Sequence, residues 1–255
     1  MAEKFKEQVI IIRQEEIADD IYSMWIRTEK IASCARAGQF VSVYCRDGSR
    51  ILPRPISICE IDRADGAIRL VYRIAGKGTE EFSDLHTGAQ LEVVGPLGNG
   101  FPKKSQKAFV IGGGIGIPPM LQLAKELKCE KQIVLGFRDE LFLAEDFKKY
   151  GDIYIATEDG SFGTCGNVLD AIRENGLQAD IIYACGPTPM LRALKKFAIE
   201  RKLECWISME ERMACGIGAC LACVCKSGHK DSHTNVKNKR ICKEGPVFRA
   251  REVDF

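Results

Sequence analysis

The sequence predicts a multi-domain chain of mixed α+β and α/β class: an antiparallel β-barrel, a parallel α/β domain and a small cysteine-rich module, in that order. Three observations lead to this prediction. Short β-forming segments separated by turn formers run to about residue 101. From Lys107 onward, apolar strands alternate with amphipathic helices. After Glu210, four cysteines fall within eleven residues. We therefore expect domains at 1–101, 102–209 and 210–255.

The first domain is predicted to be a small barrel, because its β segments are rich in Ile, Val, Tyr and Trp. Pro55 has no N–H to give to a strand ladder, so it indicates an edge or an opening. Residues 79–85 interrupt the pattern as a short helix with Thr79 as its N-cap, and the glycine-rich turn at 95–101 closes the barrel. The expected strands are 7–14, 20–28, 38–45, 55–61, 67–75 and 89–95.

The second domain is predicted to be a parallel sheet with helices on both faces. Its strands are almost continuously apolar, which is typical of strands buried on both sides. The expected strands are 107–114, 131–137, 152–159, 180–187 and 204–210, and the expected helices are 117–128, 167–175 and 188–201.

Length, charge and cysteine content limit the class of protein. A chain of 255 residues can form two domains with their own cores. The 37 Lys and Arg nearly balance 35 Asp and Glu, which argues against a nucleic-acid partner. There is no apolar leader, and the longest uncharged run is too short and too rich in glycine and proline to span a bilayer. Twelve cysteines without a leader favour reduced thiols. We expect a cytoplasmic protein with no membrane partner.

A glycine loop follows the first strand of the parallel sheet. In VIGGGIGIPPM, Gly112, Gly114 and Gly116 lead into a helix, where main-chain N–H groups can face a phosphate. Ile117 takes the place of the third glycine of the Rossmann fingerprint. A plain strand-to-helix turn with proline at the helix start is the alternative.

A second loop, YACGPTPML, repeats the order of strand, turn and helix. Gly186 and Pro187 make the turn sharp, and Cys185 lies at the lip of the sheet, where a ligand crossing the strand ends would lie. The alternative for Cys185 is a buried thiol in a turn. Together the two loops predict a dinucleotide site at one edge of the sheet.

One end of the barrel is predicted to bind a second anion. Tyr72 and Arg73 lead into a glycine-rich loop and the start of the short helix, and Arg54 directly precedes Pro55. Two arginines, a helix start and exposed strand-end main chain favour an anionic ligand. Composition alone leaves a solvated barrel end as the alternative.

The cysteine spacing predicts an iron–sulfur cluster. Cys215, Cys220 and Cys223 form C-x4-C-x2-C, with Cys242 as a distant fourth, which is the spacing of plant-type [2Fe–2S] sites. Two glycines between the first two ligands allow a tight wrap with N–H groups directed at sulfur. The alternative is structural zinc, but zinc sites usually use two C-x2-C pairs and only one is present.

Three further side chains near the cluster motif are interpreted as bystanders. Cys225 would share the face of Cys223 in an extended segment, but the spacing favours Cys223. His229 and His233 suggest a Rieske-type or zinc alternative. A Rieske centre needs two Cys–His pairs, and four cysteines make it unnecessary. We expect both histidines in a polar hairpin.

These motifs together resemble the ferredoxin reductase superfamily of flavin enzymes over the whole chain. RPIS (54–57) is similar to its flavin motif R-x-[YFP]-[ST], and GKGT (76–79) to its second flavin loop. GGGIGIPP (112–119) resembles its nicotinamide loop, and CGP (185–187) its nicotinamide-side signature. With the cysteine module, the resemblance narrows to the electron-transfer subunits of NAD-dependent, class 1B dihydroorotate dehydrogenases, which carry FAD and a [2Fe–2S] cluster.

The resemblance implies a role for each matching residue. Ser57 would lie near the flavin N5 atom that exchanges hydride, and Cys185 would approach the nicotinamide, which makes these two the candidate catalytic residues. Arg54 would contact flavin phosphate, and Pro55-Ile56 replaces a tyrosine that stacks on the flavin in many relatives. The other implied FAD contacts are Val71, Tyr72, Arg73, Gly78 and Thr79, and the implied NAD contacts are Gly112, Gly114, Gly116, Gly186 and Pro187.

Acidic strand ends favour NAD over NADP. Glu158 and Asp159 follow one strand of the α/β domain, and Asp139 offsets Arg138 after another. Such carboxylates repel the extra 2′-phosphate of NADP. Arg138 alone would favour the opposite choice.

The resemblance also implies an electron relay with a partner. Electrons would pass from an FMN-containing dihydroorotate dehydrogenase catalytic subunit through the cluster and FAD to NAD, supporting oxidation of dihydroorotate to orotate in pyrimidine biosynthesis. The complex would be a heterotetramer of two plus two chains. One alternative is a related NAD(P)H:ferredoxin-type oxidoreductase, hydrogenase or sulfide dehydrogenase subunit. Another is a non-catalytic zinc module on a degenerate flavin domain.

Overall fold

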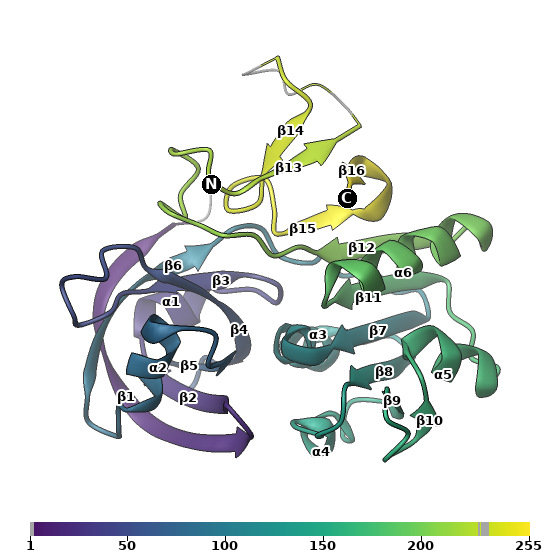
Figure 1. The fold of residues 1–255 in the computed structure, drawn as a ribbon, viewed down its shortest axis with the longest axis horizontal. Coiled ribbons are helices and arrows are strands. Elements are labelled where there is room, and N and C mark those ends of the chain that lie inside the picture. The colour runs from purple at the N-terminus through teal and green to yellow at the C-terminus, as the bar shows by residue number, and fades with distance from the viewer. Residues whose placement is uncertain (1–2, 229, 231–234) are drawn as a thin grey trace.

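The computed structural model describes residues 3–228, 230 and 235–255. A barrel and an α/β domain lie side by side, and a small module lies across one end of both (Figure 1). Within these residues, no helix is both long enough and apolar enough to cross a membrane.

The first part is a closed barrel whose neighbouring strands are all antiparallel, in the order β1-β2-β5-β4-β3-β6. Aliphatic side chains such as Ile26, Ile68 and Leu91 fill its interior. All the predicted barrel strands are present. They are β1 (Phe5–Ala18), β2 (Ile21–Arg27), β3 (Phe40–Val43), β4 (Arg54–Asp62), β5 (Ala67–Arg73) and β6 (Gln90–Leu97).

Two short helices accompany the barrel. The sequence analysis did not predict α1 (Glu29–Cys34), which buries Ile31 and Ala32. The second, α2 (Lys77–Ser83), begins earlier than predicted.

The prediction that Thr79 is the N-cap of this helix is wrong, because Gly76 occupies that position and its carbonyl accepts the first helical N–H groups. Thr79 lies in the first turn. Its hydroxyl accepts a hydrogen bond from the Ala75 N–H at 2.8 Å and donates one to the Gly76 carbonyl at 3.0 Å.

The second part is a sheet in the order β10-β9-β8-β7-β11-β12-β15. Every neighbouring pair is parallel except β12 and β15, which are antiparallel. The sheet therefore matches the predicted α/β class, with an unpredicted strand added at each edge: the short parallel β10, and the antiparallel β15 from near the end of the chain. The strands are β7 (Ala108–Gly113), β8 (Lys131–Phe137), β9 (Asp152–Thr157), β10 (Thr164–Cys165), β11 (Ile181–Cys185), β12 (Glu204–Ser208) and β15 (Val247–Arg249).

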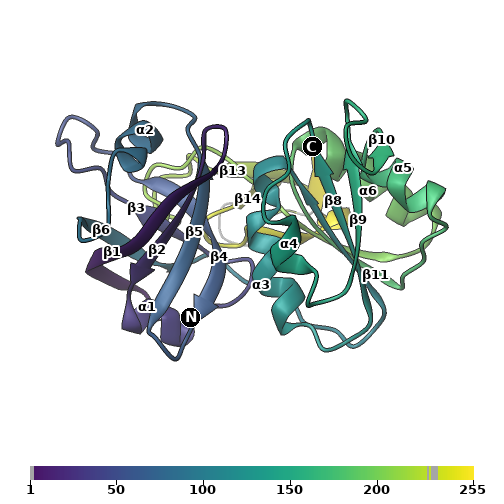
Figure 2. The same ribbon diagram turned by 90° about the horizontal axis from the view of Figure 1, so that it is seen from below.

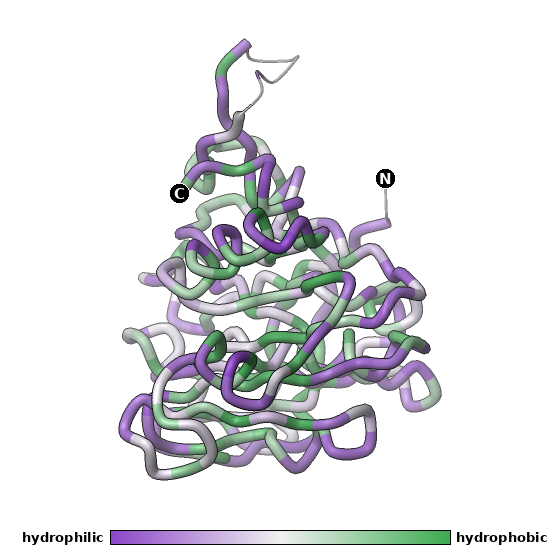
Figure 3. The backbone as a smooth tube through the Cα atoms, turned by 90° about the vertical axis from the view of Figure 1, so that its right-hand side faces the viewer, coloured by the Kyte–Doolittle hydropathy of each residue, from purple (hydrophilic) through white to green (hydrophobic). Residues whose placement is uncertain are grey.

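Helices cover both faces of this sheet. On the face toward the barrel lie α3 (Pro118–Glu126) and α4 (Ala144–Phe147), and on the other lie α5 (Val168–Glu174) and α6 (Thr188–Glu200) (Figure 2). The core on the barrel side includes Ile21 and Val71 of the barrel, so the two domains share one apolar layer. Hydrophobic segments alternate with hydrophilic ones along the coloured part of the tube (Figure 3). Two short 3₁₀ turns are η1 (Gly114–Gly116) and η2 (Ala250–Glu252).

The third part is a three-stranded sheet of β14 (Asn238–Arg240), β13 (Val224–Ser227) and β16 (Val253–Asp254). After β14 the chain returns to the large sheet as β15 and then comes back to pair β16 with β13. The core of this module is continuous with α6 through Leu191 and with the barrel through Phe40 and Leu97.

Candidate functional site

A gap between β4 and β5 lies where the sequence predicts the flavin site. Residues 54–57 of β4 pair only with β3, and β4 joins β5 from Ile58 onward. Beyond Leu70, β5 pairs only with β2. Main-chain groups along both edges of this gap are thus free to bind a ligand. The prediction that Pro55 marks an edge or an opening is confirmed.

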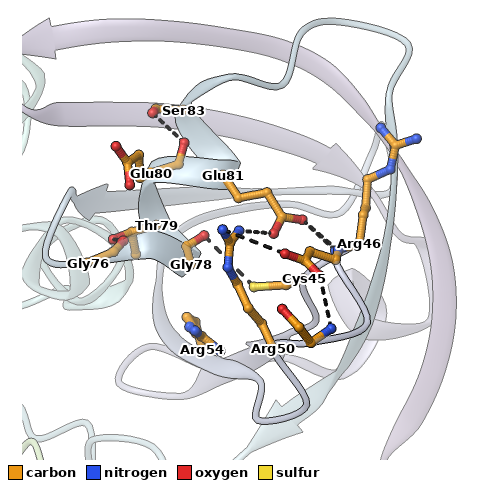
Figure 4. A network of polar contacts seen from close by, with 12 residues as sticks. Cys45, Arg46, Arg50, Arg54, Gly76, Gly78, Thr79, Glu80, Glu81 and Ser83 are labelled. Carbon is orange, nitrogen blue, oxygen red and sulfur yellow. Dashed lines mark hydrogen bonds and ion pairs between the residues drawn. The ribbon is translucent and has the colours of Figure 1, made fainter.

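The guanidinium of Arg54 lies against the start of α2, at the rim of this gap (Figure 4). A Cβ added to Gly78 would lie 2.1 Å from Arg54 Nε, so a side chain at this position would displace the guanidinium. Arg54 also donates a hydrogen bond to the Leu52 carbonyl. In the described part of the chain no carboxylate pairs with Arg54, whereas Arg50 pairs with Glu81. The charge of Arg54 is therefore available to an anion such as a phosphate.

Glu81 of α2 fastens the loop that leads to Arg54. Its carboxylate accepts hydrogen bonds from the main-chain nitrogens of Arg46 at 2.5 Å and Asp47 at 3.3 Å, and from Arg50 Nη1 at 2.5 Å (Figure 4). Burial acts to raise the pKa of Glu81, but these donors outweigh it and lower the pKa. Glu81 therefore stays charged and holds this loop and α2 together.

The predicted FAD contacts on β5 have side chains in three different surroundings. Tyr72 lies inside the barrel, stacked on Tyr22 with ring centroids 5.9 Å apart. Among the described residues its buried hydroxyl has no hydrogen-bond partner. Val71 packs between the two domains, and Arg73 lines the large cleft described next. Tyr72 can therefore offer a ligand in the gap only its main chain.

A cleft of about 910 Å³ opens at the carboxyl edge of the parallel sheet. Its walls include Gly114 of the first predicted loop and Pro187 of the second. Arg73 and Asp20 of the barrel form part of the facing wall. The two loops that the sequence predicts as a dinucleotide site therefore face one space, large enough for a ligand of that class.

Gly112, Gly116 and Gly186 shape the loops and do not line this cleft. A Cβ at Gly116 would lie 2.5 Å from main-chain atoms of Cys185 and Gly186, so the two loops pack main chain against main chain. Gly112 and Cys185 are register partners on neighbouring strands. Gly114 lines the cleft and is not packed against the other loop: no atom lies within 4 Å of its Cβ position, and its φ is 51°.

Cys185 ends β11 at the lip of the sheet, as predicted, but its side chain is 0% exposed. It packs in the core on the barrel side and is not on the cleft wall. Burial raises the pKa of the thiol. Cys185 is therefore uncharged at neutral pH, and its predicted approach to a nicotinamide stays a prediction.

Carboxylates border the outer part of the cleft. Asp139 and Glu158 line it together with Arg138, while Asp159 does not and instead accepts hydrogen bonds from the Ser161 N–H and hydroxyl. Sequence reasoning did not identify two further residues of the wall. Arg173 of α5 adds a positive charge, and Glu140 accepts a hydrogen bond at 2.9 Å from the Asp19 N–H of the barrel.

The loop around Cys215 directs main-chain N–H groups at its sulfur. The nitrogens of Ala219 and Cys220 lie 3.3 and 3.4 Å from Cys215 Sγ. Gly216 and Gly218, with φ of 66° and 89°, permit this wrap, as predicted. Burial acts to raise the pKa of Cys215, but the directed N–H groups outweigh it and lower the pKa to about 6. Cys215 is therefore mostly thiolate, the form that binds iron.

The four predicted cluster ligands form two sulfur pairs. Cys220 lies beside Cys215, and the main-chain nitrogen of Cys242 donates to Cys223 Sγ at 3.4 Å. Burial and the nearby Cys223 raise the pKa of Cys242 to about 12, and Cys215 acts in the same direction. Two adjacent thiol pairs fit the two irons of a [2Fe–2S] cluster.

The surplus sulfur, Cys225, lies on β13 and is buried. Burial raises its pKa to about 11, and the charged side chains that affect it most are Lys239 and Glu211. His229 and His233, which we predicted to be in a polar hairpin, lie outside the described residues. Over the described ranges, no three His, Cys, Asp or Glu side chains gather closely enough to hold a single metal ion.

Besides the shared core residues, the barrel contacts this module through Ser42 and Asn99. A Cβ at Gly216 would lie 2.8 Å from Ser42 Oγ, so the loop around Cys215 rests on β3. Asn99, just after β6, hydrogen-bonds to the segment 244–247 that follows Cys242. Sequence reasoning missed Asn99, because it treated the stretch GPLGNGF only as a closing turn.

Comparison with known proteins shows which proteins the chain is similar to. The family model for the iron–sulfur cluster binding domain of dihydroorotate dehydrogenase B matches residues 210–254. The electron transfer subunit of dihydroorotate dehydrogenase B (NAD(+)) from Fusobacterium nucleatum is 44% identical over 94% of this chain and 95% of its own. The protein of the same name from Bacillus velezensis is 40% identical over 97% of this chain and 98% of its own.

Solved structures have the same fold. The NADH-dependent reduced ferredoxin-NADP oxidoreductase, studied for flavin-based electron bifurcation, aligns with a TM-score of 0.87 and 30% identity over 96% of this chain and 89% of its own. The ferredoxin reductase of carbazole 1,9a-dioxygenase aligns with a TM-score of 0.66 and 19% identity over 78% of this chain and 67% of its own. The latter likeness extends to the fold alone.

Proposed function

The chain belongs to the family of electron-transfer subunits of dihydroorotate dehydrogenase B (NAD(+)), and on that premise we propose how its residues carry electrons to NAD. It is an oxidoreductase subunit with FAD, a [2Fe–2S] cluster and NAD as cofactors. Three features in one chain support the proposal: the gap in the barrel, the cleft at the sheet edge and the two thiol pairs. When bound, the flavin exchanges electron pairs with NAD and single electrons with the cluster.

The gap between β4 and β5 would hold FAD. Arg54 would bind phosphate with its guanidinium, and Gly78 would offer its main-chain N–H beside it. Thr79, whose N–H and hydroxyl are bonded to Gly76 and Ala75, would hold the turn in place. Pro55, Ile56 and Ser57, on the β4 edge of the gap, would lie along the flavin ring. Residues 54–57 pair with β3 on one side only, and their other edge supports this assignment, because a strand edge that finds no partner in the barrel can bind a ligand.

The cleft would hold NAD, with Gly114 and Pro187 at its phosphates. Gly112, Gly116 and Gly186 would set the shape of the two loops without contacting the ligand. Asp139 and Glu158 would discriminate against a 2′-phosphate by charge repulsion. Arg73 lines the same cleft from the barrel side, which supports close approach of the nicotinamide to the flavin gap.

The name of the family implies a catalytic subunit as partner. We expect this subunit to bind at the loop around Cys215. Cys220 is exposed there, and the apolar side chains of Ile217 and Leu221 beside it are 49% and 50% exposed. An electron reaches or leaves the cluster most readily where little protein covers it. We also propose an FMN-containing partner, a heterotetramer of two plus two chains, a cytoplasmic complex and domains bounded at 1–101, 102–209 and 210–255.

The decisive experiment is co-expression of this chain with an FMN dihydroorotate dehydrogenase subunit from the same genome. We expect a stable complex in which dihydroorotate-dependent NADH formation requires both chains. If the two chains neither associate nor couple while the flavin and cluster spectra are intact, the partner is another redox protein. The likeness to the ferredoxin-NADP oxidoreductase favours that alternative. Stoichiometric zinc without iron and acid-labile sulfide would contradict the cluster itself.

Two cysteine variants form a matched test of the ligand set. Cys215→Ser is expected to abolish the cluster spectrum and leave FAD content unchanged. Cys225→Ser removes the same atom from a buried thiol in the same module and is expected to leave the cluster intact. A cluster that survives the first change, or disappears with the second, would show that the ligands are assigned wrongly.

A further inference from the structure

The side chain of Asn99 uses its whole carboxamide on one short segment of the cluster module. Nδ2 donates to the carbonyls of Glu244 at 3.0 Å and Val247 at 2.8 Å, and Oδ1 accepts from the Val247 N–H at 2.9 Å. The main-chain nitrogen of Asn99 adds a bond to the Gly245 carbonyl at 2.6 Å. No other residue type offers two donors and an acceptor in this short planar arrangement.

The segment that Asn99 holds, 244–247, is the junction of all three parts of the molecule. It begins two residues after the cluster ligand Cys242. Its Pro246 carbonyl accepts a hydrogen bond at 2.9 Å from the Met209 N–H, just after β12, and Val247 begins β15 in the large sheet. Asn99 supplies the hydrogen bonds from the barrel to this junction, beside the packing of Gly98 against Pro246.

Strand register connects Asn99 to the flavin gap by a short path. Ser57 of β4 pairs with Phe40 of β3, and Phe40 pairs in turn with Leu97 of β6. Leu97 lies two residues before Asn99. The Gly98 carbonyl between them accepts a hydrogen bond at 2.9 Å from Gln39 Nε2, which anchors the turn to the barrel. Ser57 and Cys242 are therefore joined through ladder pairs and the bonds of Asn99.

We propose that Asn99 is a positioning residue for the electron step between the flavin and the cluster: its carboxamide fixes the separation of Cys242 from the flavin gap. The proposal rests on the proposed cofactors, and it adds a residue that touches neither of them. Electron tunnelling falls steeply with distance, so a clamp on this separation acts on the rate of one step. Binding of FAD and NAD involves other residues and is expected to be unaffected.

The test compares the intact, cofactor-loaded chain with Asn99→Ala and Asn99→Asp. Asn99→Asp keeps the acceptor for the Val247 N–H but loses both donors and directs charge at two carbonyls. Asn175→Ala is the matched control, since Asn175 Nδ2 also donates to a main-chain carbonyl, that of Ala171 at 2.9 Å, on the far helix α5. Rapid mixing with NADH follows the flavin and cluster absorbance bands separately. The EPR spectrum of the partly reduced protein reports the magnetic coupling between flavin and cluster.

In both Asn99 variants we expect flavin reduction at the wild-type rate and cluster reduction slowed by roughly tenfold to a hundredfold. The magnetic coupling should weaken, with iron and FAD contents unchanged. Asn175→Ala should leave both rates and the coupling unchanged. Unaltered coupling and cluster reduction in the Asn99 variants, with only a lower Tm, would overturn the inference. Loss of the cluster from both variants would also overturn it, because Asn99 would then build the module and not position it. A wild-type chain without flavin and cluster signals would instead contradict the proposed function.

Discussion

Replacement of Gly116 by alanine tests whether the two loops of the large cleft depend on direct main-chain packing. The added methyl group would lie 2.5 Å from three main-chain atoms, the Cys185 carbonyl carbon and the nitrogen and Cα of Gly186. Main chain cannot rotate away as a flexible side chain can. To reach the ordinary contact distance of 3.4 Å, the second loop must move by about 0.9 Å.

Forcing a methyl group into a closely packed site costs about 1–3 kcal/mol. Gly116→Ala should therefore lower the free energy of unfolding by this amount. It should also raise the Kd for NADH, because the moved loop carries Pro187 on the cleft wall. Gly116 has a negative φ, so left-handed strain makes no contribution to this cost.

Two other glycines separate the effect of steric contact from the effect of left-handed backbone strain. Gly114 and Gly176 have φ of 51° and 59°, and no atom lies within 4 Å of either Cβ position. Alanine at each should cost about 1 kcal/mol through the left-handed backbone alone. Only Gly114 lines the cleft, so Gly114→Ala should change the Kd for NADH and Gly176→Ala should not.

Urea denaturation measures the free energy of unfolding, and fluorescence titration with NADH measures the Kd. The reasoning is refuted if Gly116→Ala has wild-type stability and wild-type NADH affinity. It is also refuted if Gly176→Ala weakens NADH binding as much as Gly116→Ala does, since a general loss of stability would then explain the effect.

Two further predictions concern the other sites. Leu221 lies between two cluster ligands and has a φ of 60°. Leu221→Asn should stabilise the loaded chain by about 0.5–1 kcal/mol, because asparagine tolerates this left-handed conformation better than leucine does. The same change should weaken association with the catalytic subunit, because it removes an exposed apolar side chain. An increase in urea sensitivity of the cluster absorbance would contradict the first part. Glu81→Gln should cost about 1 kcal/mol at neutral pH, because the carboxylate accepts three hydrogen bonds. Since the folded pKa of Glu81 is lowered, its stabilisation is present above the ordinary glutamate pKa and is lost as pH falls through the lowered value. Wild type and variant should therefore converge in acid; a pH-independent difference in Tm would contradict this.

Local patterns were enough to predict the barrel strands and most of the parallel sheet. Apolar runs bounded by turn formers led directly to β8 and β11, and Pro55 marked the opening of the barrel. The cysteine spacing led to the two thiol pairs. Apart from the distant Cys242, each of these signals acts within a few residues and is retained in the folded chain.

Features that depend on long-range contacts were not predictable in this way. The start of α2 is a local exception, since the sequence near Thr79 resembles a helix start but the carbonyl of Gly76, three residues earlier, begins the helix. The buried side chain of Cys185 results from packing between sheet and barrel, and the role of Asn99 from a partner 145 to 148 residues away. Neither has a local pattern, because the groups that matter come from another part of the chain.

The return of the chain from the cysteine module to the large sheet has a consequence for biosynthesis. The edge strand β15 follows Cys242 in the chain, and β16 then closes the small sheet. A ribosome therefore releases the barrel and the parallel strands well before the last thiol ligand and both closing strands have been made. The sheet can gain its final edge only after all four ligand cysteines have emerged. Completion of the ligand set and completion of the large sheet are thus both late events of synthesis, and the module cannot be exchanged as an independent cassette without leaving β12 as an open edge.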